Sequence, residues 1–456
     1  MKILFILPSN GFGYPKLMKR FFHPPNLSFP ILAALTPKSH IITFIDDNIE
    51  KIPYRKTFDL VAISVNTPNA PHAYEIADNF RKFGTKVVLG GIHVSMLPEE
   101  ASRHCDSVIC GEAESIWDNV LSDAEANQLK KVYKASEYVC PSKIPIPDRS
   151  ILRWKSLLPL STIQISRGCP HKCSFCSVSA FFGGTYRYKP VEEVIKEISA
   201  LKRSFIFFVD DNIVGNPSYA EELFTALKPL KVKWISQSSL EICKKPHLLK
   251  LARESGCYGL MFGFDSVVPT SIKEMSKAHN KSEKYFDYIR LVQEHGIATV
   301  GSFIFGFDHD DESVFEKTVS FALESHLDLA YFFMLTPYPG TSLYNKLEAE
   351  ERIFERDWSK YDTYNAVFIP KQLSCGQLVR GTKYAWETFY SAKNIAIRMI
   401  KKPRVILLAM NIFFNLRRKT YLSDFSHISE QPSTTASLGE TRIQKGVVTH
   451  GSAGSD

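Results

Sequence analysis

The sequence predicts an α/β protein with two successive parallel sheets and a helical region after them. Short apolar runs alternate with helix-like patterns over residues 1–120, and the same alternation returns over residues 161–335. The runs are almost continuously apolar, which is typical of strands that are covered on both faces of a parallel sheet. A chain of 456 residues is also longer than one domain usually accommodates.

The first repeat predicts a doubly wound, Rossmann-like domain over residues 1–135. Residues 73–83 carry apolar residues at helical spacing between strand-like runs. In such sheets ligands lie beyond the carboxyl ends of the strands, here the loops at 64–68, 90–93 and 111–114. The expected strands are 3–7, 41–45, 60–65, 87–89 and 107–109.

The second repeat predicts a partial barrel of six parallel strands over residues 161–345. Before it the regular pattern is lost from about residue 121, and the proline-rich stretch 136–160 is expected to be a linker. After it residues 346–425 are predicted to be helical, and residues 426–456 are predicted to be a disordered tail. The expected barrel strands are 162–166, 205–209, 232–236, 258–264, 299–305 and 329–335.

Composition excludes several classes of protein. The first residues lack the pattern of a signal peptide, and no run of eighteen apolar residues occurs, so we expect a cytoplasmic protein. The net charge of +8 equals the eight basic residues between Lys393 and Lys419, where no acidic residue occurs. Charge is otherwise balanced, which argues against a nucleic-acid partner. Six scattered cysteines, outside the motif described next, are expected to be buried small hydrophobes.

Three cysteines lie close together directly after the first expected barrel strand. Cys169, Cys173 and Cys176 can hold three irons of a four-iron four-sulfur cluster and leave one iron open for a ligand. A zinc ribbon would need a second pair of cysteines or histidines at matching spacing, and none is present. Three adjacent structural thiols are the alternative interpretation.

Polar residues and glycines follow the other barrel strands where a ligand of such a site would lie. Each of these residues could alternatively be a turn or helix-capping residue. The candidates are Asp210, Asp211 and Asn212 after the second strand, Gln237 after the third, Asp265 and Ser266 after the fourth, and Gly301 and Gly306 in the fifth.

This motif, with Phe175 directly before the last cysteine, resembles the radical SAM superfamily. The resemblance implies that S-adenosylmethionine (SAM) chelates the open iron and that Phe175 lies near its adenine. It places residues 210–212 at the methionyl amine, Asp265 and Ser266 at the ribose, and Gly301 to Gly306 at the adenine. The family often has Gly-Gly-Glu at the amine and Glu at the ribose, so residues 210–212 and Asp265 depart from its pattern.

The amino-terminal domain resembles the cobalamin-binding domains that precede a radical SAM barrel. The resemblance rests on Gly90, Gly91 and His93, on Gly111 and Glu112, and on the later run 338–341. Glycines at strand ends would let a flat corrin ring approach the backbone. The Asp-x-His-x-x-Gly fingerprint is missing after the first strand, so the lower axial ligand is unassigned, with His93 and His72 as candidates.

The resemblance implies a cobalamin-dependent radical SAM enzyme, and the hypothesis is a methyltransferase acting on an unactivated carbon. A bulky apolar small molecule, such as a lipid or terpenoid, is the expected substrate. A cobalamin-assisted cyclase or oxidoreductase without methyl transfer and an RNA-modifying methylthiotransferase are alternatives, as is a non-catalytic iron–sulfur module. Flavodoxin or ferredoxin is the expected electron donor.

Residues 393–419 are a candidate peripheral membrane contact. Arg404, Asn411, Asn415 and Arg418 fall on one face of a helical pattern that is otherwise almost wholly apolar. Such a basic helix could lie on an anionic membrane surface. The alternative is a helix docked on the barrel with solvated ends.

Overall fold

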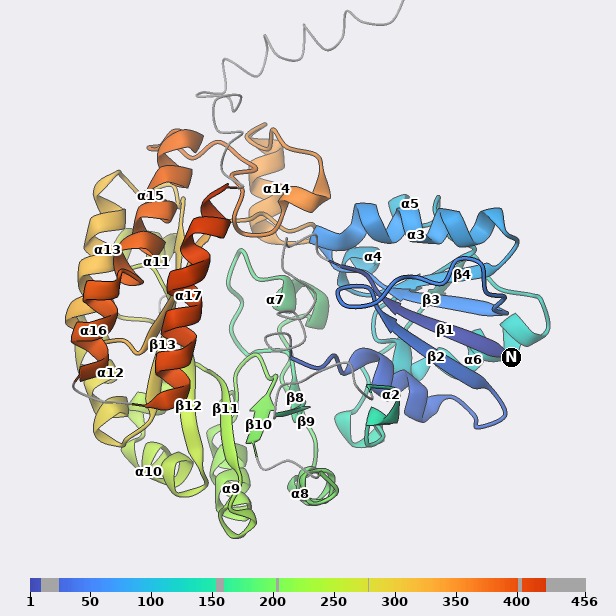
Figure 1. The fold of residues 1–456 in the computed structure, drawn as a ribbon, viewed down its shortest axis with the longest axis horizontal. Helices are drawn as coiled ribbons and strands as arrows, with labels where there is room; N and C mark the ends of the chain where they lie inside the picture. The colour runs from blue at the N-terminus through green and yellow to red at the C-terminus, as the bar shows by residue number, and fades with distance from the viewer. Residues whose placement is uncertain (10–23, 153–159, 202–204, 278, 401–403, 424–456) are drawn as a thin grey trace, which may run out of the picture.

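Two six-stranded parallel sheets form the frame of the protein. The computed structural model describes residues 1–9, 24–152, 160–201, 205–277, 279–400 and 404–423. The amino-terminal sheet lies at the right of Figure 1, in blue, and the second sheet lies at the left, in green to orange. The two expected α/β repeats are therefore confirmed.

The first sheet has the strand order β2-β1-β3-β4-β5-β6 and is covered on both faces. Leu4 and Ile6 of β1 pack with the helix α3, whereas Ile3 and Phe5 pack with α2 and α6. This period of two buries every residue of a continuous apolar strand. The elements are β1 (Lys2–Leu7), α2 (Ser28–Leu35), β2 (Ile41–Asp46), β3 (Leu60–Ser64), α3 (Ala70–Lys82), β4 (Lys86–Gly90), α4 (Ile92–Met96), α5 (Pro98–Ala101), β5 (Ser107–Cys110), α6 (Trp117–Glu125) and β6 (Val132–Lys134).

The strand β6 corrects the expectation that regular structure is lost from about residue 121. It pairs in parallel with β5 at the edge of the sheet. Only Tyr133 of its three residues is buried. A strand this short gives no detectable periodicity, which is why the sequence did not predict it.

The second sheet has the order β14-β13-β12-β11-β10-β7, and all its pairs are parallel. The six expected barrel strands are present. The strands are β7 (Ser161–Ile163), β10 (Phe205–Phe208), β11 (Lys233–Ser238), β12 (Cys257–Asp265), β13 (Ala298–Phe305) and β14 (Leu329–Met334). The helices are α7 (Ser177–Phe182), α8 (Val191–Ser199), α9 (Pro217–Leu227), α10 (Pro246–Glu254), α11 (Pro269–Glu274), α12 (Tyr285–Glu294) and α13 (Ser313–Glu324).

The first expected barrel strand, 162–166, is divided in two. After β7 the chain leaves the sheet and forms β8 (Ser166–Arg167), which pairs antiparallel with β9 (Arg187–Tyr188). The carboxylate of Asp210 accepts hydrogen bonds from the backbone amides of Ile165 and Ser166. These bonds satisfy buried amides that no neighbouring strand pairs at the break.

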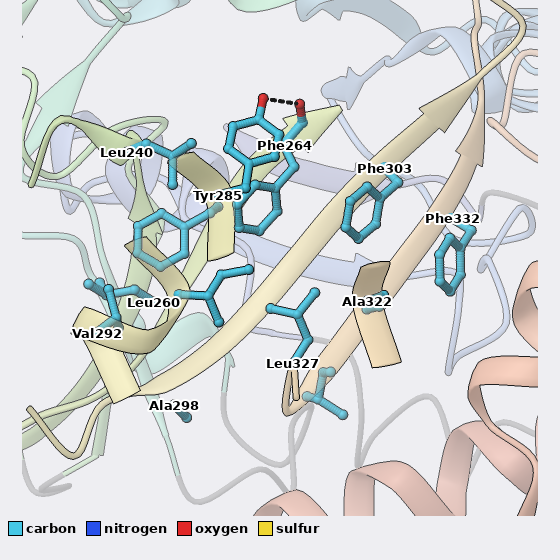
Figure 2. Packing of buried hydrophobic residues seen from close by; sticks show 14 of the residues in the cluster. Leu240, Leu260, Phe264, Tyr285, Val292, Ala298, Phe303, Ala322, Leu327 and Phe332 are labelled. Atoms are coloured by element: carbon cyan, nitrogen blue, oxygen red, sulfur yellow. Dashed lines mark hydrogen bonds between the residues drawn. The ribbon is translucent and has the colours of Figure 1, made fainter. Parts of the chain in front are cut away.

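Alternate residues of the barrel strands face outward and form an aromatic layer under the helices. Figure 2 shows Phe264 of β12, Phe303 of β13 and Phe332 of β14 in this layer. The rings of Phe303 and Phe332 stack at 5.7 Å between centroids. The intervening residues of the same strands are thereby directed to the inner face of the barrel.

The region after the barrel contains the expected helices, but residues 350–374 between them form no α-helix and include a short 3-10 helix, Trp358–Lys360, and a bridge between Ile353 and Phe368. Its helices are α14 (Ser342–Ala349), α15 (Cys375–Phe389), α16 (Ala392–Ile400) and α17 (Val405–Ser423). The predicted disordered tail, 426–456, lies outside the described residues. Among the helices that are described, none has the length and apolar character needed to cross a bilayer.

A buried cluster of charges joins the two sheets, and we call Glu112, Arg167 and Arg187 the interdomain clamp. Glu112, after β5, is 3% exposed and accepts hydrogen bonds from Arg167 Nη1 at 2.5 Å and Arg187 Nη1 at 2.9 Å. The two arginines face one another across the β8–β9 pair. Like charges at such opposed positions repel, so Glu112 is needed between them.

Two further contacts support this clamp. Glu114 pairs with Arg167, whose positive charge holds the pKa of the Glu114 carboxyl below its usual value although burial opposes this. The backbone amide of Val139 donates to Glu112 at 2.7 Å. The clamp therefore connects the end of β5, the stretch after β6 and the strand that leads into the cysteine loop.

Replacing Glu112 tests the clamp. In Glu112→Gln two buried guanidinium groups lose their carboxylate, and breaking a buried ion pair in this way costs about 3–5 kcal/mol. We expect a clearly lower unfolding midpoint in calorimetry. Glu99→Gln, at an exposed position in α5 of the same domain, is the control and should unfold like the wild type. Equal midpoints for both variants would show that the clamp contributes nothing.

Candidate functional site

The three cysteines of the motif lie around one cavity at the carboxyl ends of the barrel strands. The cavity has a volume of about 250 Å³ and is lined by Cys169, Cys173 and Cys176 together with Phe175. All three thiols are free and partly exposed. Burial raises the pKa of the Cys173 thiol to about 12 and also raises that of Cys169.

The cysteine loop is held in place by backbone bonds from two directions. The amide of Ser174 donates to the carbonyl of Met275 at 3.2 Å, and the amide of Leu343 donates to the carbonyl of Ser174 at 2.9 Å. Cys176 is the N-cap of α7, which begins at Ser177. The barrel and the start of α14 therefore both fix the loop.

The thiols do not converge on one point. Among the described residues, no three side chains of His, Cys, Asp or Glu lie close enough to bind a single metal ion. A tetrahedral zinc site requires such convergence, whereas in a cluster each thiolate binds a different iron. The arrangement therefore suits a cluster better than a single ion.

Of the predicted polar candidates, Asp211, Asn212, Gln237 and Asp265 line this cavity with the cysteines. Burial raises the pKa of Asp211 to about 6. Asn212 is 2% exposed, and its Oδ1 accepts from the amide of Ser239 at 2.9 Å. Among the described residues, neither Asn212 Nδ2 nor Ser239 Oγ has a hydrogen-bond partner. Buried polar atoms are rarely unsatisfied, so these two groups fit a polar ligand.

Asp265 has an unusual backbone conformation for a residue with a side chain. Its φ is 61°, in the left-handed region, where the end of β12 also shifts register against β13. Aspartate tolerates this region better than most residues, and such conformations cluster at functional sites. The carboxylate pairs with Lys277, whose Nζ also donates to the Gly263 carbonyl at 2.8 Å.

Four candidates do not line the cavity, and each has a structural role instead. Asp210 holds the break after β7, which removes it from the position expected for the methionyl amine. Ser266 Oγ accepts from the amide of Val268 at 3.0 Å and so closes a turn. Gly306, with φ of 110°, donates its amide to Asp310.

The fourth is Gly301, which faces the outer aromatic layer. A Cβ at this position would lie 2.7 Å from Leu327 Cδ1 and 3.0 Å from a ring carbon of Phe303. Because side chains alternate along a strand, Ser302 and Ile304 line the cavity instead. Of residues 301–306, Ser302 and Ile304 therefore line the cavity and the two glycines do not, and the contact of this stretch with adenine stays a prediction.

The sequence did not single out several residues that line the cavity. Lys277, His279 and Asn280 follow α11 in a short polar stretch that resembles an ordinary turn. His171 lies inside the cysteine motif, and its ring stacks on that of His279 with centroids 3.8 Å apart. Burial and the nearby cations lower the pKa of His279 to about 4, so this imidazole is neutral at pH 7.

A second cavity, of about 530 Å³, lies between the carboxyl edge of the first sheet and the barrel. It is lined by Gly90, Gly91, Gly111 and Glu112 from the sheet side, and Arg167, Phe181 and Phe182 are among the barrel residues that line it. This is the crevice where doubly wound sheets bind ligands.

Two of the three glycines are required by the backbone. Gly91 has φ of 118°, and a Cβ there would lie 2.4 Å from the carbonyl oxygen of Val65. Gly111 has φ of 88°. A Cβ on Gly90 would make only ordinary contacts. The absence of side chains at this rim is thus partly a consequence of how closely the backbones at the ends of β3 and β4 approach one another.

His93 does not line the second cavity. It is fully buried, with Nδ1 3.2 Å from Thr67 Oγ1 and Nε2 3.3 Å from Glu100 Oε1. Glu100 also accepts from Trp358 Nε1 at 3.0 Å, so this network joins the first domain to the region after the barrel. His93 is a structural histidine in this contact.

His72 and the scattered cysteines are likewise outside both cavities. His72 Nε2 lies 2.7 Å from Asp47, and its Nδ1 lies 3.5 Å from Glu75. Five of the six scattered cysteines are buried, as expected, whereas Cys140 is exposed on the stretch between the domains.

Comparison with known proteins identifies both domains. Residues 163–322 match the family model of the radical SAM superfamily, and residues 27–121 match that of the B12 binding domain. The chain is 35% identical over 404 residues to bacteriochlorophyllide d C-12(1)-methyltransferase of Chlorobaculum tepidum, covering 85% of this chain and 88% of that protein.

Two further proteins are similar to this chain at lower identity. Hopanoid C-2 methylase of Rhodopseudomonas palustris is 27% identical over 74% of this chain and 66% of its own length. The solved structure of OxsB, a cobalamin-dependent S-adenosylmethionine radical enzyme with aqua-cobalamin and S-adenosylmethionine bound, superposes with a TM-score of 0.66 at 15% identity, covering 99% of this chain and 82% of that chain. The chain belongs to the radical SAM superfamily, among the enzymes whose radical SAM domain follows a B12-binding domain.

Proposed function

We propose that this enzyme is a cobalamin-dependent radical SAM methyltransferase that methylates an unactivated carbon of a bulky apolar small molecule. One observation carries the proposal. The segment from Arg167 to Phe182 lines both cavities, with its cysteines and Phe175 facing the first and Arg167, Phe181 and Phe182 facing the second. A radical source and a methyl donor that serve one substrate carbon must be neighbours in this way.

The residues of the first cavity fit a cluster and SAM. Cys169, Cys173 and Cys176 would hold three irons, as the donor chemistry of a site-open cluster requires. Asp211 and Asp265 supply carboxylates for an ammonium group and ribose hydroxyls, and Asn212 Nδ2 is a free donor. When bound, the cluster and SAM supply a hydrogen-abstracting radical, and cobalamin supplies the methyl group.

The residues of the second cavity fit the corrin ring of cobalamin. Gly90, Gly91 and Gly111 line the cavity without side chains, and Phe181 and Phe182 are among the aromatic residues that line it. Among the described residues that line this cavity there is no histidine, so neither His93 nor His72 is proposed as a lower axial ligand. The role of Glu112 in the clamp is to position Arg167 and the cysteine loop beside this cavity.

The proposed substrate class is supported by the relatives and by apolar residues that line the second cavity, among them Leu27, Phe29 and Ile31. The two relatives named above act, by their names, on a bacteriochlorophyllide and on a hopanoid, which are large and predominantly apolar. An electron donor such as flavodoxin or ferredoxin would reduce the cluster. A peripheral membrane contact through residues 393–419 completes the proposal.

A cobalamin-assisted cyclase or oxidoreductase is the main rival, because it would use the same two cavities. The RNA-modifying methylthiotransferase is weaker, since it needs ligands for a second cluster in the first domain. Cys105 and Cys110 are 1% and 9% exposed in the core beside the first sheet. Two thiols that pack in a core are poor candidates for such a cluster.

Loss of one motif cysteine should abolish radical formation. We expect Cys169→Ala, reconstituted anaerobically with iron and sulfide, to form no 5′-deoxyadenosine from SAM and dithionite in a chromatographic assay. The control Cys140→Ala removes an exposed cysteine outside both cavities. This variant should form 5′-deoxyadenosine at the wild-type rate. Undiminished formation by Cys169→Ala would overturn the cluster assignment.

Labelled SAM separates methyl transfer from the rival reactions. With SAM that carries a deuterated methyl group, a methyltransferase delivers the label to its product, whereas a cyclase or oxidoreductase does not. Bacteriochlorophyllide d and a hopanoid are the first substrates to test, with mass spectrometry as the readout. A product that forms without the label would refute methyl transfer and leave the radical assignment intact.

Lys277 should control SAM affinity by orienting Asp265. Burial disfavours the positive charge of Lys277, but the nearby Asp265 and Cys173 favour it and raise the pKa of the Lys277 amine above its usual value. Lys277→Met leaves the Asp265 carboxylate without this partner, and losing a charged hydrogen bond predicts about tenfold weaker SAM binding. Equilibrium dialysis with reconstituted protein measures this change.

The matched control is Lys281→Met, at an exposed position four residues along the chain. It should leave the dissociation constant for SAM at the wild-type value. If Lys277→Met bound SAM as tightly as this control, Asp265 would not be the ribose ligand or would not need Lys277.

A further inference from the structure

The last described helix, α17, is packed with its polar side inward. Asn411 is fully buried, and its Nδ2 donates to the carbonyl of Asp328 at 3.1 Å. Asn415 donates to the carbonyl of Tyr390, and Arg404, directly before the helix, donates to the carbonyl of Gly296 at 2.8 Å. These polar groups hold the helix against the barrel and α15, together with the buried Leu407 and Phe414.

The opposite side of α17 presents apolar residues to the outside. Val405 is 84% exposed, Leu408 40%, Ile412 47% and Leu416 70%. Their spacing of three, four and four residues places them on one helical face, and we call these four residues the outer strip. In Figure 1 α17, in red, lies across the outside of the barrel beside α15 and α16.

This helix differs from a normal surface helix because it carries apolar residues on its outer side as well as on its buried side. In a soluble protein the apolar stripe of an amphipathic helix faces the core and the polar face meets water. A continuous exposed apolar patch usually marks an interaction site. Ile406, 45% exposed on α17, and Ile397, 48% exposed on α16, extend the patch.

The charge of the surrounding segment indicates what covers the outer strip. Residues 393–419 contain eight basic residues and no acidic residue. Arg398 and Arg404 donate to backbone carbonyls, and Lys393 is exposed. By sequence position, the other five lie directly before Arg404 and at residues 417–419. An apolar face flanked by cations matches an anionic lipid surface, where each Lys or Arg adds about 1 kcal/mol of attraction. A second copy of the chain would instead bring two cationic segments together.

We propose that the outer strip of α17 docks this enzyme on the surface of an anionic membrane. The helix would lie in the plane of the bilayer surface, with the four strip residues among the acyl chains and the basic residues at the headgroups. This inference specifies the membrane contact of the proposed function and does not depend on the cofactor chemistry, so it can fail while the proposed methyltransferase activity holds.

Vesicle sedimentation with the full-length reconstituted protein tests the proposal. We expect binding to vesicles of phosphatidylcholine and phosphatidylglycerol, little binding to phosphatidylcholine alone, and weaker binding at high salt, since exposed charges are screened. Replacing Ile412 and Leu416 by Gln removes two large apolar side chains from the interface and should weaken partitioning by about tenfold or more. The double variant should keep the wild-type rate of 5′-deoxyadenosine formation, which shows that the fold is intact.

The matched control is Phe83→Gln in the first domain. Phe83 is an apolar residue that is 70% exposed, as Leu416 is. It should bind vesicles like the wild type. Equal binding by the double variant and this control, or no binding by the wild type, would overturn the proposal.

Two other partners could cover the outer strip, and each would give a different experimental result. If the wild type sediments as a dimer and the Ile412→Gln, Leu416→Gln variant as a monomer, the strip is an interface between two copies. If only a chain that ends at Ser423 binds vesicles, residues 424–456 cover the strip in the full-length protein. Either result would also overturn the membrane proposal.

Discussion

The carboxylate of Glu112 is the constraint on which the arrangement of the two domains depends. It is buried between Arg167 and Arg187, which face each other on the β8–β9 pair and would repel without it. Arg167 is two residues from Cys169, so the clamp fixes the cysteine loop relative to the first sheet. A desolvated ion cluster of this kind adds little net stability, but it specifies one relative position, since any displacement leaves charges buried and unpaired.

In this fixed position, the segment from β8 to α7 lines both cavities. The loop presents the cysteines to the barrel cavity, and α7 presents Phe181 and Phe182 to the cavity at the first sheet. The break after β7 makes this possible, and Asp210 stabilises the break by accepting the amides that the sheet no longer pairs. Asp210 therefore supports the site without lining the cavity.

The sequence predicted the elements well, because buried parallel strands and their helices have strong periodic signals. It predicted the cysteine trio from spacing and Phe175 from the resemblance to the radical SAM superfamily, and the structure places all four around one cavity. It did not distinguish the two faces of a strand, so Gly301 was chosen where Ser302 and Ile304 line the cavity. Nor could it identify Lys277, which meets Asp265 only because α11 and the turn after it return to the end of β12.

For the helix α17, too, the sequence did not show which face meets the protein. The pattern of residues 404–418 predicts an amphipathic helix whichever side meets the protein, and the usual preference would bury the apolar face. The barrel instead offers backbone carbonyls at Gly296, Asp328 and Tyr390, which bind polar side chains. Once these bonds fix the orientation, Leu407 and Phe414 are buried beside the polar side chains and the outer strip points outward. An enzyme proposed to act on large apolar molecules, which concentrate in bilayers, would gain access to its substrate from such a surface.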